Sequence, residues 1–165
     1  MSTSNLPPAS SIPVATLGAR PEVASAIRTL LEPEYDLVHI CTNPQTATAE
    51  LPPLCAGNLS NPETSGLGSN SSRPVSERRV PRAIIFGGAV DDVTLEGVMG
   101  AVREAVAAAG EKKEAEGEEG KKEVPVVVRV TRADILAQGV DVPNPEVITK
   151  VIMGKCEELK GKGLL

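Results

Sequence analysis

Two residues of a short apolar segment, His39 and Cys41, have side chains that could act as a base and a nucleophile. The segment YDLVHICT (35–42) is predicted to be a strand, in which residues two positions apart point to the same face about 7 Å apart. His39 is the only histidine of the chain, so any histidine-dependent catalysis must use it. We expect both side chains to lie in the interior beneath a helix, and we therefore assign no catalytic residue.

The sequence offers few metal ligands. Beside the single histidine it has three cysteines, Cys41, Cys55 and Cys156, which are widely spaced and show no CxxC pattern. No three carboxylates stand at the spacing of a ligand set. We predict no metal site, and we expect the cysteines to be reduced thiols of a cytoplasmic protein. The sequence identifies no cofactor.

The segment RAIIFGGAVDD (82–92) could be either a phosphate loop or a turn from a strand into a helix. A phosphate loop uses glycines such as Gly87 and Gly88 so that backbone N–H groups can approach an anion at a helix N-terminus. Asp91 and Asp92, however, put two carboxylates where the anion would lie, and they can satisfy the helix N-terminus themselves. Neither GxGxxG nor GxxxxGK[ST] is present. We therefore favour the turn.

A better candidate for anion binding follows the first predicted strand, where Gly18 and Arg20 precede a helix. Arg20 would add a fixed positive charge, although Glu22 nearby counts against such a site. Arg132, at the end of the last strand, could converge on the same point. For Arg132 we nevertheless favour a structural ion pair, with Asp134 or Asp91.

The elements that must position these residues alternate along the chain. Apolar segments predict strands at 12–19, 35–42, 82–88 and 124–132. Helical periodicity predicts helices at 20–33, 91–110 and 144–163. A short helix is possible within 43–57, but Pro52-Pro53 should interrupt it.

Strands that read as continuous apolar segments are typical of a parallel sheet covered by helices on both faces. We predict an α/β fold: a small three-layer sandwich with a four-stranded parallel sheet in the order 2-1-3-4, flavodoxin-like or Rossmann-like. In such sheets ligands bind outside the carboxyl ends of the strands. The candidate ligand-binding residues at that edge are Gly18, Arg20, Thr42, Gly87, Gly88, Thr131 and Arg132.

We expect residues 1–11 to be a flexible tail and residues 12–165 to form a single α/β domain. Two segments interrupt the pattern of this domain. Residues 57–80 are rich in Ser, Asn, Pro and Gly, and residues 111–123 are a mixed-charge run with glycines. We predict both to be disordered insertions.

Composition narrows the classes of partner. The chain of 165 residues has a net charge of −5, and Tyr35 and Phe86 are its only aromatic residues. A phosphate backbone would be repelled and bases would find no stacking platform, so we expect no nucleic-acid partner. No apolar segment has membrane-spanning length and the N-terminus lacks the features of a signal peptide, so we expect no membrane association and a cytoplasmic (intracellular) location.

These observations favour a small intracellular binding or regulatory module that is not a catalyst. It would bind a small anionic ligand or a protein partner at the carboxyl ends of the strands. One alternative is an enzyme of the doubly wound class acting on a nucleotide or a phosphorylated substrate, so enzymatic activity stays open. The other is an oligomeric interaction domain without a ligand, because a four-stranded sheet leaves an edge that could form a homodimer.

Overall fold

The computed structural model describes residues 6–18, 20–115, 117 and 123–165. The strands are β1 (Ile12–Leu17), β2 (Tyr35–Cys41), β3 (Ala83–Phe86) and β4 (Val126–Arg129). The helices are α1 (Pro21–Leu31), α2 (Pro44–Cys55), α3 (Asp92–Ala115), α4 (Arg132–Leu136) and α5 (Pro145–Gly161). Two short 3-10 helices, η1 (Ser69–Ser72) and η2 (Val75–Glu77), lie between α2 and β3.

The four strands form one parallel sheet in the order β2-β1-β3-β4, which confirms the predicted topology. The last residue of β1, Leu17, pairs with Cys41 on one side and with Phe86 on the other, and Phe86 pairs with Arg129. The carboxyl ends of all four strands are therefore level at one edge of the sheet.

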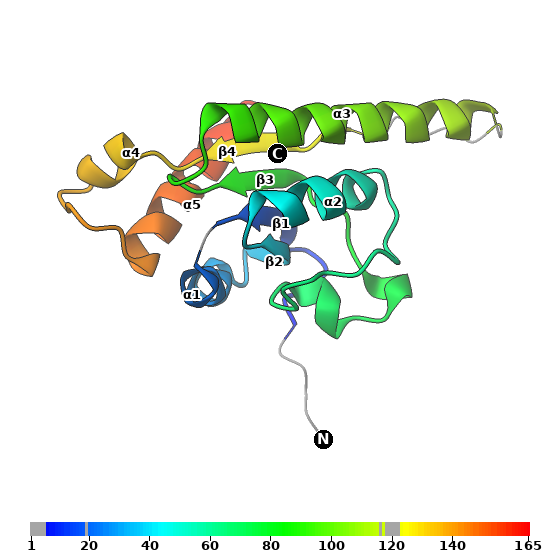
Figure 1. Ribbon diagram of the computed structural model, residues 1–165. Coiled ribbons are helices and arrows are strands. Elements are labelled where there is room, and N and C mark those ends of the chain that lie inside the picture. The colour runs from blue at the N-terminus through cyan, green and yellow to red at the C-terminus, as the bar shows by residue number, and fades with distance from the viewer. Residues whose placement is uncertain (1–5, 19, 116, 118–122) are drawn as a thin grey trace, which may run out of the picture.

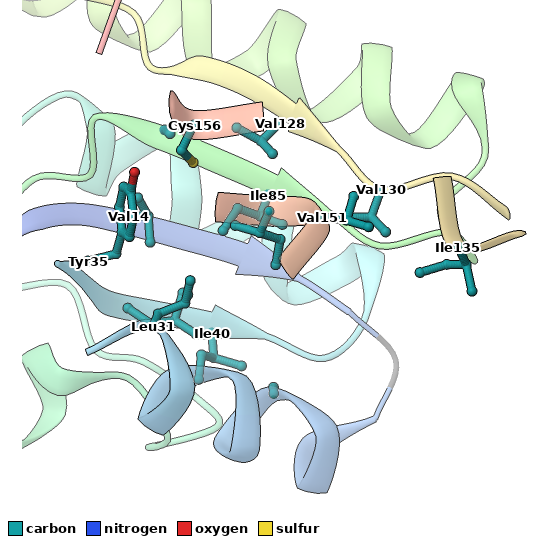
Figure 2. Close-up of a cluster of buried hydrophobic side chains, with 14 residues drawn as sticks. Val14, Leu31, Tyr35, Ile40, Ile85, Val128, Val130, Ile135, Val151 and Cys156 are labelled. Carbon is teal, nitrogen blue, oxygen red and sulfur yellow. The ribbon is translucent and has the colours of Figure 1, made fainter. Parts of the chain in front are cut away.

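Helices cover both faces of the sheet, as a three-layer sandwich requires (Figure 1). Alternation along β3 shows the division: Ile85 belongs to the core shared with α1 and α5, whereas Ile84 and Phe86 belong to the core shared with α2 and α3. Figure 2 shows the first of these cores, where Ile85 of β3 lies near Val151 of α5.

An irregularity in β2 decides which face its last residues occupy. Val14 pairs with Leu37 but Ala15 pairs with His39, so Val38 is an extra residue, a β-bulge. Because side chains alternate along a strand, the extra residue moves every later side chain to the other face. His39 and Cys41 therefore face α2, although Leu37, which has the same sequence parity, faces the α1 and α5 core.

Helix α2 continues through Pro52 and Pro53, so the predicted interruption there is wrong. Proline lacks the N–H that would bond the carbonyl four residues earlier, and an interior proline disfavours a helix. Here the pair lies in the last turn, between Leu51 and Leu54, which are both buried. Packing against α3 outweighs the local cost.

Helix α4 was not predicted, although its local signal is present in the sequence. Thr131 Oγ1 accepts a hydrogen bond from Asp134 N at 3.2 Å, and Asp134 Oδ2 accepts one from Thr131 N at 2.7 Å. This reciprocal pair is a capping box. With only five residues the helix has too short an apolar pattern for periodicity to reveal it.

Residues 57–80 differ from the disordered insertion expected from composition. They contain η1 and η2 and pack against β2, with Ser69, Asn70 and Arg73 buried. Composition favours disorder when a segment has little apolar surface to bury. This segment is instead attached by charged and polar side chains, whose partners lie far away in the sequence.

The predicted tail also has structure where it is described. Residues 6–11 lie beside Arg79, whose guanidinium donates hydrogen bonds to the carbonyl oxygens of Ala9 and Ser11, and Ser11 is buried. Residues 1–5 lie outside the described residues.

Only part of the predicted insertion at 111–123 is described. Helix α3 extends to Ala115, so residues 111–115 continue the helix, whereas residue 116 and residues 118–122 lie outside the described residues. Among the described residues, no helix is long and apolar enough to cross a membrane.

Candidate functional site

A pocket of about 580 Å³ opens at the carboxyl edge of the sheet. Its floor is where β1, β2 and β3 end: Gly18 N donates to the carbonyl of Cys41 at 3.0 Å, and Gly87 N donates to that of Leu17 at 3.1 Å. These bonds hold the loops after the three strands side by side. The pocket therefore lies where a parallel α/β sheet is expected to bind ligands.

All seven residues selected from the sequence line this pocket. They are Gly18, Arg20, Thr42, Gly87, Gly88, Thr131 and Arg132. They follow the four strands of the sheet. Because the last residues of these strands are paired with one another, the four connections begin side by side and the residues come together. Their shared position is a structural fact, whereas their role in ligand binding stays a prediction.

Most of the remaining lining is aliphatic. It includes Val23, Ala24, Ile27, Leu37, Ile85, Val130, Ile135, Ile148 and Ile152. These side chains belong to α1, α4, α5 and the adjoining strands, so the pocket continues into the core on that face of the sheet. A ligand would meet an apolar interior beneath a polar rim.

The turn after β3 has the structure of a strand-to-helix connection. Gly87 N bonds Leu17, and Val90 N donates to the carbonyl of Gly87 at 3.1 Å. Asp91 Oδ1 accepts a hydrogen bond from Thr94 N at 2.7 Å, as an N-cap does, which confirms that an aspartate satisfies the start of α3. The hydrogen bond from Thr94 lowers the pKa of Asp91, so the carboxylate is charged.

Arg20 lies on the pocket rim but already has a partner. Its Nε donates to Glu22 Oε1 at 3.0 Å, and both side chains are largely exposed. A backbone hydrogen bond at Glu22, together with the hydrogen bond from Arg20, lowers the pKa of the Glu22 carboxyl. Glu22 therefore counts against an anion site at Arg20, as the sequence indicated, because it partly neutralises the charge that Arg20 would offer a ligand.

The prediction that Arg132 pairs with Asp134 or Asp91 is wrong. Asp134 Oδ2 accepts from Lys155 Nζ at 2.9 Å as well as from Thr131. Burial opposes ionisation of Asp134, but the bonds from Lys155 and Thr131 outweigh it and lower its pKa. Arg132 is exposed and forms no ion pair with any described residue.

Sequence reasoning missed the side of the pocket formed between α4 and α5. Asp141 and Pro143, from the connecting loop, and Ile148 from α5 line this side. The other residues were selected because they follow the carboxyl ends of strands. No strand ends between α4 and α5, so that criterion could not select Asp141, Pro143 or Ile148. The loop does end at a recognisable cap, Asn144, whose side chain accepts from Val147 N at 2.9 Å.

His39 and Cys41 lie outside the pocket, in a second polar region beneath α2. Both are buried, as predicted, and face Glu50 of α2. His39 Nε2 lies 2.8 Å from Glu50 Oε2, and Cys41 Sγ lies 3.8 Å from the same oxygen. Glu63 approaches the other side of the imidazole, with Oε2 at 3.8 Å from His39 Nδ1.

Sequence analysis singled out neither Glu50 nor Glu63. Burial opposes ionisation of Glu50, but hydrogen bonds from Thr64 and His39 outweigh it and lower the pKa of Glu50. Burial, followed by the charges of Glu50 and Glu63, raises the pKa of the Cys41 thiol far above its ordinary value. Glu50 follows a threonine-rich stretch and is followed by Leu51 and two prolines, and nothing in this local sequence indicates that it will be buried.

The chain is similar to one curated protein over part of its length. Kojic acid related protein 6 of Aspergillus oryzae (strain ATCC 42149 / RIB 40) is 31% identical over 102 residues, which are 61% of this chain. The chain spans about half the length of that relative, 55%. No protein-family model matches the chain, and no solved structure matches it.

Proposed function

We propose that this protein binds a small organic anion with an apolar body in the pocket at the carboxyl edge of the sheet. Arg132 would hold the charged group, and the aliphatic side chains beneath it would hold the body of the ligand. The observation that carries the proposal is Arg132 itself, an arginine on the pocket rim with no ion-pair partner among the described residues.

The size and lining of the pocket support a small ligand. Binding sites for small molecules are typically about 300–1,000 Å³ and mostly apolar, with a few polar groups that fix orientation. The observed pocket of about 580 Å³, with Thr42 and Thr131 among its polar groups, fits that description. Threonine hydroxyls can both donate to and accept from an uncharged part of the ligand.

The charges around the pocket favour a ligand with one negative charge. Asp91 and Asp141 also line it, and Arg20 is already paired with Glu22. A dinucleotide or a sugar phosphate would bring about two charges towards these carboxylates, and like charges repel. A monocarboxylate would require only Arg132.

Binding is favoured over catalysis because of what the polar groups of the pocket already do. Asp91 caps α3, and the residues of the capping box at Thr131 bond one another. His39 and Cys41, the side chains best suited to acid–base or nucleophilic work, do not line the pocket. The enzyme alternative would need a ligand that supplies its own reactive group.

A thermal-shift panel tests the proposal. It compares aliphatic and aromatic monocarboxylates with phosphosugars, nucleotides, dinucleotides and kojic acid, the last because of the relative's name. A ligand that binds only the folded state stabilises it by about 2.7 kcal/mol at a hundred times its dissociation constant. We expect a shift with a monocarboxylate that Arg132→Ala removes and Arg20→Ala reduces, with Arg103→Ala, on the exposed face of α3, as the control.

Two results would contradict the proposal. A flat panel would exclude these ligand classes, and a shift that persists in Arg132→Ala would place the anion elsewhere. A shift confined to nucleotides would support the enzyme alternative and direct the next assay to turnover.

Self-association is a second candidate function, favoured by the edge of the sheet. Within the described residues β4 pairs with β3 alone. Val127 of β4 is 37% exposed, and Val124, which precedes the strand, is 39% exposed. An edge strand with an exposed valine can pair with the same strand of a second copy. Light scattering after gel filtration should then show a dimer that Val127→Lys dissociates, and a monomer at all concentrations would reject it.

A further inference from the structure

The polar region beneath α2 contains more buried negative charge than its neighbours balance. Glu50 and Glu63 are carboxylates with side-chain exposures of 7% and 3%. Of the described residues, His39 alone offers either of them an ion-pair partner, and no lysine or arginine does. Even with a charged imidazolium, one negative charge is left over in the interior, where an unbalanced charge is costly.

Three side chains of this region converge as metal ligands do. His39, Cys41 and Glu50 each offer one ligand atom, all three residues are buried, and these atoms all lie within 4.8 Å of one another. In a tetrahedral zinc site, bond lengths of about 2.0–2.3 Å place ligand atoms about 3.4–3.6 Å apart. The 2.8 Å and 3.8 Å separations from Glu50 Oε2 to His39 Nε2 and Cys41 Sγ lie on either side of that value.

From this convergence of buried ligand atoms we propose a zinc-class divalent metal site formed by His39 Nε2, Cys41 Sγ and Glu50 Oε2. A neutral imidazole, a thiolate and a carboxylate around Zn²⁺ sum to zero charge. With Glu63 included, the region carries one negative charge, the same as with an imidazolium and two carboxylates, so the metal binds without changing its net charge. With three protein ligands, the fourth tetrahedral position is occupied by water. The thiol proton and the proton between His39 and Glu50 leave when the metal binds.

The surroundings orient the ligands. Glu50 Oε1 accepts from Thr64 N at 2.8 Å and also from the Thr64 hydroxyl, which leaves Oε2 directed at the metal position. Glu63 Oε2 lies on the Nδ1 side of His39 at 3.8 Å. That distance is too long for a hydrogen bond, so Glu63 acts on the imidazole through its charge and not by fixing its tautomer. Both of its oxygens accept hydrogen bonds from other groups, Ile40 N and Gly68 N among them, so Glu63 is a neighbouring charge and not a ligand.

The β-bulge at Val38 makes the arrangement possible. It moves His39 and Cys41 to the face that α2 covers, where Glu50 lies. Bulges commonly redirect side chains next to functional sites. The site was not expected from the sequence because its ligands come from a strand and a helix and do not follow a single spacing pattern.

Cobalt substitution provides the test, because Co²⁺ bound to a thiolate gives a near-ultraviolet charge-transfer band that Co²⁺ bound to oxygen and nitrogen does not. The full chain, purified with a chelator and then dialysed, is titrated with Co²⁺. Because the ligands are buried, a second sample is refolded with Co²⁺ present. We expect one Co²⁺ per chain with a thiolate band, displaced by one equivalent of Zn²⁺.

Variants assign the band to this site. Cys41→Ser should abolish it, whereas Cys55→Ala and Cys156→Ala, which alter the other two buried thiols, should keep it. If Cys41→Ser does not fold, survival of the band in both control variants still assigns it to Cys41, since the chain has three cysteines. Glu63→Gln should keep the band, because Glu63 is not a ligand.

Two outcomes would overturn the proposal. The first is the absence of a thiolate band in both the titrated and the refolded protein. The second is loss of the band in Cys55→Ala or in Cys156→Ala, which would assign the metal to another thiol.

Discussion

Two buried acidic regions attach the same long segment to the sheet, and they are balanced differently. Asp36, with a fully buried side chain, faces two arginines: Arg73 Nη1 lies 2.8 Å and Arg79 Nη1 3.1 Å from its Oδ2. Glu50 and Glu63 face one histidine. The Asp36 region is supplied with more than enough positive charge by the protein, whereas the Glu50 region is not.

The comparison teaches that a segment with the composition of disorder can be held in place by charge. Residues 57–80 have few apolar residues to bury, yet Arg73 and Arg79 reach Asp36, and Ser69 donates a hydrogen bond to the same carboxylate. Glu63 of that segment accepts hydrogen bonds from Ile40 N and from Gly68 N. Both regions therefore act as tethers that hold residues 57–80 against the sheet.

Asp36→Asn should produce the largest loss of stability. The substitution keeps the shape but leaves Arg73, whose side chain is 6% exposed, without its counter-charge. Breaking a buried pair from one side costs about 3–5 kcal/mol. Urea unfolding measures this loss of stability. The control is Arg103→Ala, which removes the exposed ion pair between Arg103 and Glu96 and should cost about 0–1 kcal/mol. Equal losses in the two variants would contradict the assigned role of Asp36.

Gly68→Ala should have an intermediate effect, because this glycine lies where the segment crosses the bulge. A Cβ there would overlap the carbonyl oxygen of Val38 and lie 2.5 Å from Glu63 Oε2 and 2.7 Å from the Cα of His39. Backbone atoms cannot move aside cheaply, and overpacking costs about 1–3 kcal/mol.

The matched control for Gly68→Ala is Gly97→Ala on α3. A Cβ at Gly97 has nothing within 4 Å, and alanine favours a helix over glycine by about 1 kcal/mol. Thermal unfolding should therefore move in opposite directions for the two variants. A neutral Gly68→Ala would show that the segment does not approach β2 so closely.

Glu50→Gln should have the smallest effect when no metal is present. The amide keeps an oxygen for Thr64, and its nitrogen can donate to His39 Nε2, so the hydrogen bonds are replaced and one excess buried charge disappears. We expect a cost of about 1 kcal/mol or less in urea unfolding with a chelator present. A loss as large as that of Asp36→Asn would show that the Glu50 region, too, depends on its full charge.

Much of the fold could be predicted from the sequence, for physical reasons that individual elements show. The apolar stretch of β3 and the helical spacing of Leu95, Val98 and Met99 on α3 are local patterns, and all of these α3 side chains are buried. Right-handed crossovers and the alternation of strands and helices then leave few possible sheet orders. The pocket residues followed from that order, because parallel strands end at one edge.

Other features depended on partners distant in the sequence. Nothing local to Asp36 predicts that Arg73 and Arg79 will bury it, and nothing local to Pro52 predicts that packing against α3 keeps α2 helical through it. The same holds for Arg132: its nearest carboxylate in sequence, Asp134, is taken by Lys155 of α5. An ion pair depends on distance in space, which local sequence does not encode.

The sequence by itself determined the sheet, its order and the edge at which the candidate pocket lies, because these depend on hydrophobic periodicity and on turn residues. The tertiary structure alone decided which face His39 and Cys41 occupy. One extra residue in β2 reverses the alternation of side chains, and that bulge arises from the pairing of β2 with β1. The meeting of these two residues with Glu50 is therefore a property of strand register, which no spacing along the chain could show.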